Sequence, residues 1–181
     1  MTALSTLEFS ITFHSPFRVS TGHAAPGLDT GVDGANPLPA SSLKGVMRAT
    51  ASQLLGEVRL VDEVFGSPEQ ESPWLWRDAV GNWDQPKPAT RVSLDAETHA
   101  AAKDMLVVQE QIGTDSARFT ITQRHRLDEQ DFAKHRLVLA VAGQATRSLG
   151  GNRRRGLGWV TITSESPKLD DSSAAAFLEL A

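Results

Sequence analysis

The sequence contains no cysteine, which excludes a disulfide framework and a thiolate metal site. It has no apolar run of membrane-spanning length, and Met1 is not followed by the basic start and apolar core of a signal peptide. We therefore expect a cytoplasmic protein that makes no membrane contact. The chain has 181 residues, 40% of them hydrophobic, which predicts a single domain with its own core.

Positive charge is also scarce, because 18 Lys and Arg residues face 22 Asp and Glu residues, for a net charge of −4. This balance argues against a protein whose whole surface coats nucleic acid, but it does not exclude a local basic groove. The cations are mostly arginine, which suits bidentate contact with phosphate and stacking on bases.

Hydrophobic periodicity predicts a strand over residues 7–14, then a long loop to Pro39 and a helix that Ser41 or Ser42 caps. Gly45 in that helix costs up to about 1 kcal/mol relative to alanine and would let another backbone approach closely. We interpret Asp62 to Lys87 as irregular, with its three tryptophans in ordinary packing. Further strands are predicted over 90–95, 105–112, 117–123 and 159–165.

A second helix is predicted over 135–149, opened by Asp128 or Asp131 and ended by Gly150–Gly151. A short helix can follow in the C-terminal tail. Without an insertion between the middle strands, this order matches a split βαβ, or ferredoxin-like, sandwich of the α+β class.

The motif LGGNRRRGLGWVTI, residues 149–162, places three arginines among four glycines. Consecutive backbone N–H groups in a glycine-rich turn can bind an anion, and the arginines add bidentate donors. The motif lacks the GK[ST] of a phosphate-binding loop, and its glycines lead into a strand, unlike a dinucleotide fingerprint. A plain solvated turn is the alternative.

Two other segments contain candidate residues. Lys44 and Arg48 lie four residues apart near a helix start, where free N–H groups favour phosphate, although a solvated helix face would give the same pattern. Asp29 and Asp33 lie in a glycine-rich loop, where carboxylates mostly cap turns but can also hold Mg²⁺. His23 of that loop is a candidate general base, or simply a surface residue.

Four blocks together, PASSLKGVMRA, VFGS, TRVSLDAET and LGGNRRRGLGWV, resemble the RAMP superfamily of CRISPR–Cas proteins. More narrowly, they resemble the repeated backbone subunit of type III effector complexes. The resemblance implies one RAMP domain over residues 1–181, with a ferredoxin-like or RRM-like core. It also implies a β-rich thumb insertion at about residues 84–118.

The resemblance further implies partners and roles. Such subunits stack head to tail along a CRISPR guide RNA that pairs with target RNA, and they contact other effector subunits. The residues that it assigns to RNA binding are Ser42, Lys44, Arg48, Gly150, Gly151, Arg153, Arg154 and Arg155. It places Asp33 where catalytic members carry an aspartate that supports metal-dependent cleavage of the target, with Mg²⁺ or another divalent ion.

Three other hypotheses stay open. The chain could be a structural RNA-binding subunit without activity, or a guide-processing endoribonuclease that uses a base such as His23 and no metal. It could also be a stand-alone ferredoxin-like domain that binds a small anion at the glycine-rich loop.

Overall fold

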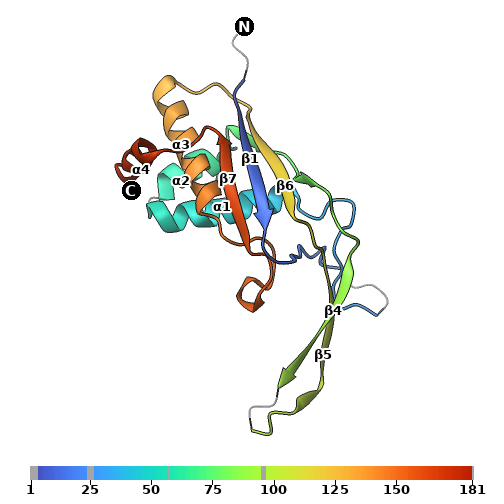
Figure 1. The fold of residues 1–181 in the computed structure, drawn as a ribbon. Coiled ribbons are helices and arrows are strands. Elements are labelled where there is room, and N and C mark those ends of the chain that lie inside the picture. The colour runs from blue at the N-terminus through green and yellow to red at the C-terminus, as the bar shows by residue number, and fades with distance from the viewer. Residues whose placement is uncertain (1–3, 24–26, 57, 95–96, 181) are drawn as a thin grey trace.

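An antiparallel sheet with helices on one face and a long projecting hairpin makes up the protein (Figure 1). The structure is a computed structural model that describes residues 4–23, 27–56, 58–94 and 97–180. The helices are α1 (Ala40–Leu55), α2 (Val58–Phe65), α3 (Glu129–Ala145) and α4 (Asp171–Leu178), with a 3₁₀ turn η1 (Arg153–Arg155). The strands are β1 (Thr6–Phe13), β2 (Trp74–Trp76), β3 (Val80–Gly81), β4 (Lys87–Leu94), β5 (Ala101–Gln111), β6 (Ser116–Gln123) and β7 (Val160–Ser166).

The main sheet has the strand order β2-β6-β1-β7, and β3 also pairs with β6. In this order β6 lies between β1 and β2. All of these pairs are antiparallel, so β6 runs opposite to both β1 and β2, which are therefore parallel to each other. The unit β1–α1–β2 is therefore a split βαβ unit, because another strand separates its two strands. The predicted α+β class is confirmed.

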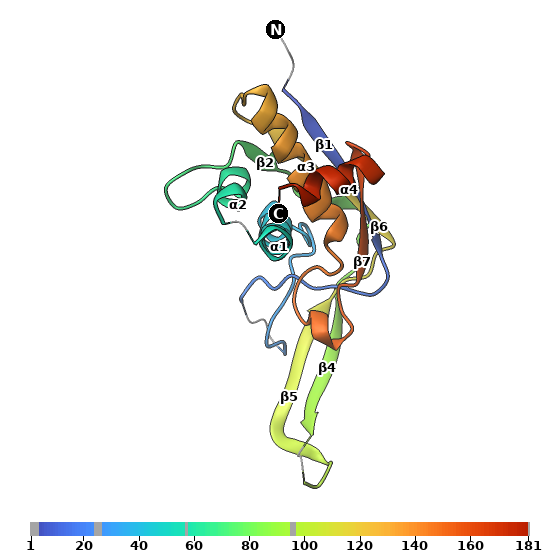
Figure 2. The same ribbon diagram turned by 90° about the vertical axis from the view of Figure 1, so that its left-hand side faces the viewer.

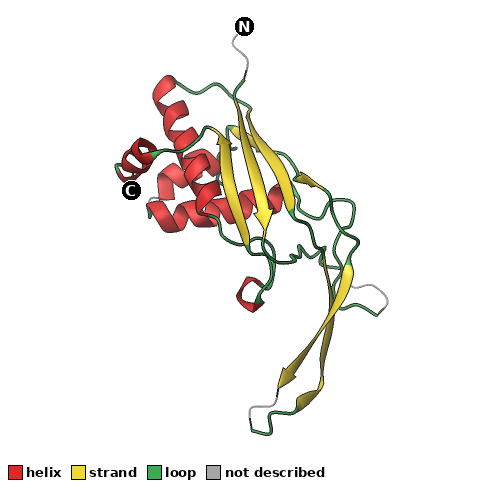
Figure 3. Cartoon of the chain, in the orientation of Figure 1, coloured by secondary structure: helices red, strands yellow, loops and turns green. Residues whose placement is uncertain are grey.

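The core lies between the sheet and the helices (Figure 3). Alternate residues of β1 point into it, as the period-2 pattern predicted, and Phe9 stacks on Phe119 of β6 with ring centroids 4.7 Å apart. Helix α3 crosses this face closely because Gly143 has no side chain. A Cβ there would lie 2.6 Å from the Phe9 ring. The opposite face of the sheet, which we call the open face, carries no helix (Figure 2).

Strands β4 and β5 form a separate two-stranded hairpin that extends away from the body (Figure 1). Their predicted counterparts at 90–95 and 105–112 are confirmed, although β5 begins earlier, at Ala101. Residue 95, the last residue of the first predicted strand, lies outside the described residues. Val92 and Leu106 face each other across the hairpin, and they are 52% and 58% exposed.

Several predicted boundaries were wrong. Helix α1 has Pro39 at its N-cap, and the carboxylate of Asp78 accepts from the N–H of Ala40 at 2.7 Å, so neither Ser41 nor Ser42 caps it. Helix α3 is capped by Asp128, one of the two predicted residues, but it starts before residue 135 and ends at Ala145. It stops before Gly150–Gly151 because the residues after it turn away to bond the segment that leads into β7.

The stretch from Asp62 to Lys87 is more regular than the sequence suggests. It contains the end of α2, which sequence reasoning missed, and the short strands β2 and β3. Trp74 and Trp76 are buried on β2, which confirms that they pack in the core. Gly45 faces open space, so no backbone approaches it, contrary to the prediction. Among the described residues, no helix is long and apolar enough to cross a membrane.

Candidate functional site

The glycine-rich loop, residues 149–158, is held tightly against the segment that follows β1, and we call it the arginine loop. Gly150 and Gly158 have φ angles of 74° and 72°, which favour glycine. A Cβ would lie 2.2 Å from the Arg18 carbonyl oxygen at Gly150, and 1.9 Å from the Leu149 carbonyl oxygen at Gly158. The N–H of Gly151 donates to the Arg18 carbonyl at 2.8 Å. This N–H is thus engaged inside the protein.

The three arginines of the loop point outward. Arg153, Arg154 and Arg155 form η1, between Asn152 and Gly156, which both adopt left-handed backbone angles. All three side chains are exposed, and within the described part of the chain none of them forms a hydrogen bond or an ion pair. Three uncompensated charges on one turn create a local positive potential on an acidic protein.

The arginine loop lies at the root of the β4–β5 hairpin, as both views show (Figures 1 and 2). Asn152 Nδ2 donates to Gln109 Oε1 of β5 at 2.9 Å. Arg18 Nε donates to the Glu110 carbonyl at 3.0 Å, and its Nη2 donates to Thr30 Oγ1 at 2.5 Å. Three segments distant in sequence therefore meet here, and we call this region the hairpin root.

Arg18 is the centre of the hairpin root, and sequence reasoning missed it. Arg18 is only 6% exposed. Its burial, and then the charge of Arg91, lower the pKa of its guanidinium group. Glu110 opposes that shift. Arg18 works as a structural cross-link between the arginine loop and β5. A single arginine in an irregular segment has no sequence pattern that would predict such a role.

Of the two predicted aspartates, Asp29 contacts the hairpin, whereas Asp33 forms only a local bond. Asp29 pairs with β5, since its N–H donates to the Val108 carbonyl at 2.9 Å and its Oδ2 accepts from the Val108 N–H at 2.8 Å. Asp33 is exposed, and its Oδ1 accepts from the Ala35 N–H at 2.8 Å, which is a turn-capping bond. Across residues 4–23, 27–56, 58–94 and 97–180, no three His, Asp or Glu side chains are grouped as metal ligands.

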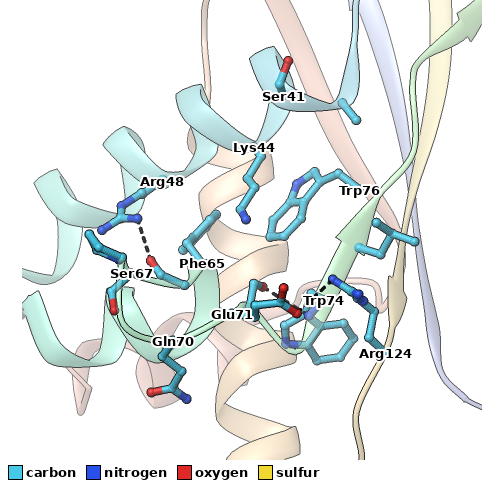
Figure 4. A pocket seen from close by; sticks show the side chains of 15 residues that line it. Ser41, Lys44, Arg48, Phe65, Ser67, Gln70, Glu71, Trp74, Trp76 and Arg124 are labelled. Atoms are coloured by element: carbon cyan, nitrogen blue, oxygen red, sulfur yellow. Dashed lines mark hydrogen bonds and ion pairs between the residues drawn. The ribbon is translucent and has the colours of Figure 1, made fainter.

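A second cationic region is a pocket of about 600 Å³ at the start of α1, which we call the α1 pocket (Figure 4). Lys44 and Arg48 of α1 line it together with Arg124, while Trp76 forms part of its wall. The Lys44 ammonium lies 5.3 Å from the centre of the Trp76 ring, a cation–π contact. Burial, and then the charges of Arg48 and Arg124, lower the pKa of Lys44.

The predicted RNA-binding residues of α1 are not equivalent in the structure. Arg48 Nη1 donates to the Gly66 carbonyl at 2.6 Å, and Nη2 forms an ion pair with Asp62, so Arg48 ties α1 to the end of α2. Lys44 carries no such bond among the described residues and keeps its charge toward the pocket. Ser41 lines the pocket, whereas Ser42 does not.

These features define a class: an α+β protein with an open antiparallel sheet, a projecting hairpin and a pinned arginine loop at the hairpin root. The profile of the RAMP superfamily matches residues 10–161, so the chain belongs to this superfamily. The match includes Asp33, the α1 residues and the arginine loop. A search of curated proteins finds no match.

Solved structures share the fold. A chain of the "Cryo-EM structure of the Type III-B Cmr-beta bound to cognate target RNA" is 20% identical with a TM-score of 0.61, over 88% of this chain and 58% of that one. This protein thus spans a little over half of that chain's length. A chain of the "Type III-B Cmr-beta Cryo-EM structure of the Apo state" is 12% identical with a TM-score of 0.67, over 90% of this chain and 98% of that one.

Proposed function

We propose that the protein is an RNA-binding subunit of a type III CRISPR effector complex, where it holds guide RNA paired with target RNA. The observation that carries this proposal is the arginine loop, with three exposed guanidinium groups that lack partners among the described residues. Membership in the RAMP superfamily supports it, as does the likeness to a chain of a complex bound to cognate target RNA.

The arginine loop suits a phosphate backbone. Guanidinium groups contact phosphate oxygens through two N–H donors, and such contacts position RNA without reading its sequence. The arginine loop is anchored to Arg18 and to β5, and this support keeps the three charges together. Lys44 in the α1 pocket provides a further cation for RNA, while Arg124 beside it forms an ion pair with Glu71.

The hairpin suits contact with a neighbouring subunit in a head-to-tail filament. A two-stranded hairpin alone is only marginally stable in water. Its exposed Val92 and Leu106 would lose apolar surface to water on packing against a neighbour. Because the hairpin of one copy would reach the body of the next, the contact is heterologous and propagates along the RNA.

Salt-dependent binding tests this proposal. We expect replacement of Arg153, Arg154 and Arg155 by alanine to weaken binding of a labelled single-stranded RNA. Each lost phosphate contact flattens the plot of log affinity against log salt by about 0.7. A matched control that replaces Arg77, Arg126 and Lys168 by alanine removes three exposed charges elsewhere and should change the slope less. An unchanged slope in the triple variant would remove these arginines from the RNA interface.

We also propose that the subunit cleaves target RNA with the help of Asp33. Mg²⁺ in proteins is bound through one or two carboxylates, with water and substrate phosphates as its other ligands. Asp33 fits that form of site, because it is exposed and only its Oδ1 takes part in the turn bond. The bound ion would stabilise charge on the phosphate that is attacked.

The reaction that fits is attack by a target 2′-hydroxyl on the adjacent phosphorus. The 2′-oxygen loses its proton and forms a P–O bond, while the bond to the 5′-oxygen breaks and that oxygen gains a proton. The products are a 2′,3′-cyclic phosphate and a 5′-hydroxyl end. The protein contributes by holding the kinked strand so that these atoms are in line.

Mapping of the cuts tests this step. In an assembled complex with matched target RNA and Mg²⁺, Asp33→Asn keeps the acceptor that the Ala35 N–H needs and removes only the charge. We expect regularly spaced cuts for the wild type and for the distant control Asp171→Asn, and loss of the cuts in Asp33→Asn. Undiminished cutting by Asp33→Asn would assign the chemistry elsewhere and leave a structural RNA-binding subunit. Cleavage of guide precursor that resists EDTA would instead favour the guide-processing alternative.

A further inference from the structure

Trp159, directly after the arginine loop, is the one aromatic residue among the large exposed hydrophobic residues of the described chain. It is 58% exposed. Its backbone is fixed, because its N–H donates to Ser15 Oγ at 3.0 Å and its carbonyl accepts from the His14 N–H at 2.8 Å. The indole is therefore presented to solvent from a rigid position and does not sit on a mobile segment.

Trp159 belongs to the open face of the sheet. In β7 the residues Val160, Ile162 and Ser164 are buried toward the helices, and the residues between them are exposed. Side chains alternate along a strand, so Trp159 shares the open face with Thr161. His14 of the neighbouring chain segment lies there too, since its Nε2 is 2.8 Å from Thr161 Oγ1.

Charge separates the two ends of the open face. The arginine loop lies at the end with Trp159, and Arg155 precedes Trp159 by four residues. At the other end, Glu8 and Glu165 are exposed, and Glu165 accepts a hydrogen bond from Ser10 at 2.6 Å. Arg118 lies beside Glu8 and Glu165, so these three side chains carry a net charge of −1, whereas the end with Trp159 carries the three arginines of the loop. A polyanion is therefore attracted more strongly to the end with Trp159.

We propose that Trp159 stacks on a base of the RNA strand whose phosphates the arginine loop holds. This inference rests on the proposed RNA-binding function and adds its mode of base contact. An aromatic side chain beside a cationic groove is the arrangement that holds single-stranded nucleic acid, and stacking accepts every base because each has a π face. It therefore suits a subunit that must accept any guide sequence.

Fluorescence anisotropy with the full chain and a labelled single-stranded RNA of mixed sequence tests this inference. Trp159→Ala should weaken binding by about tenfold, and Trp159→Phe should retain most of the affinity. Thr163→Ala, on the same face of the same strand, is the matched control and should bind like the wild type. The salt slope of Trp159→Ala should equal that of the wild type, because no phosphate contact is lost.

A second probe separates base contact from backbone contact. With an oligonucleotide that contains abasic sites throughout, the wild type and Trp159→Ala should bind equally. If Trp159→Ala binds the normal RNA as tightly as the wild type does, the inference is wrong while the proposed function stands. Equal losses for both oligonucleotides, or loss of self-association alone in sedimentation, would also overturn it. Absence of RNA binding by the wild type would refute the proposed function itself.

Discussion

Replacement of Gly158 by alanine should destabilise the fold much more than replacement of Gly156, two residues away. Both glycines have positive φ angles, 72° and 81°, so each substitution carries the strain of a left-handed backbone, about 1–2 kcal/mol. A Cβ at Gly156 meets nothing within 4 Å, whereas a Cβ at Gly158 would lie 1.9 Å from the Leu149 carbonyl oxygen.

The overlap at Gly158 is hard to relieve. Leu149 N–H donates to the Gly158 carbonyl, and Gly158 N–H donates to the Pro16 carbonyl, each at 2.8 Å. Forced overpacking costs about 1–3 kcal/mol in addition to the backbone strain, so we expect Gly158→Ala to lose about 2–5 kcal/mol of unfolding free energy. For a domain of this size that lowers Tm by about 4–20 °C, against about 2–8 °C for Gly156→Ala.

Thermal and urea unfolding followed by circular dichroism would measure both variants against the wild type. The comparison isolates the close approach of Leu149, because the backbone strain is common to the two substitutions. Equal losses for Gly156→Ala and Gly158→Ala would refute the reasoning, and would mean that the loop shifts freely to make room.

Four further substitutions test the structure by unfolding and RNA-binding measurements. Gly45→Ala should raise the unfolding free energy by about 0.5–1 kcal/mol, since the site is exposed, helical and open; a loss would show that the position is crowded. Arg48→Ala should cost about 1 kcal/mol because it breaks a tie between two helices, whereas Lys44→Ala should change stability little and weaken RNA binding; the reverse order would contradict the roles assigned here. Burial lowers the pKa of His135, so the unfolded chain binds its proton first as pH falls below about 6.5, and stability present above that pH is lost below it. His135→Gln should remove this part of the pH dependence between pH 7 and pH 5, and an unaltered profile would exclude His135 as its source.

Much of the fold was predictable because strong periodicity reports burial directly. The alternation in β1 predicts the face that meets the core and is confirmed. In α1, Leu43 and Met47 of the expected apolar face are buried, whereas Leu54 of that face is exposed. Helix α2 was missed because it spans only eight residues, about two turns, between Gly56 and Gly66, which is short for a helical period to be recognised. The cap of α1 was wrong because Asp78, 38 residues away, provides the acceptor.

The candidate site divides in the same way. Chemistry concentrated in a short motif, such as the three arginines between glycines, is visible in the sequence because composition alone makes it unusual. Arg18 and Arg124 are single residues in ordinary surroundings, and nothing local distinguishes them. Trp159 stands in the arginine motif, but the sequence does not show that its ring is exposed. Each becomes informative only through burial, through neighbours far along the chain, or through the exposure of a large ring.

By itself, the sequence determined the α+β class, the RAMP resemblance and the loop that concentrates positive charge on an acidic chain. Those properties follow from local spacing and composition. Only the tertiary structure decided that Arg48 braces two helices while Lys44 faces a pocket, and that Asp29 pairs with β5 while Asp33 stays exposed. The physical reason is that a side chain's role depends on the partners that folding brings within hydrogen-bonding distance, and these partners are remote in sequence.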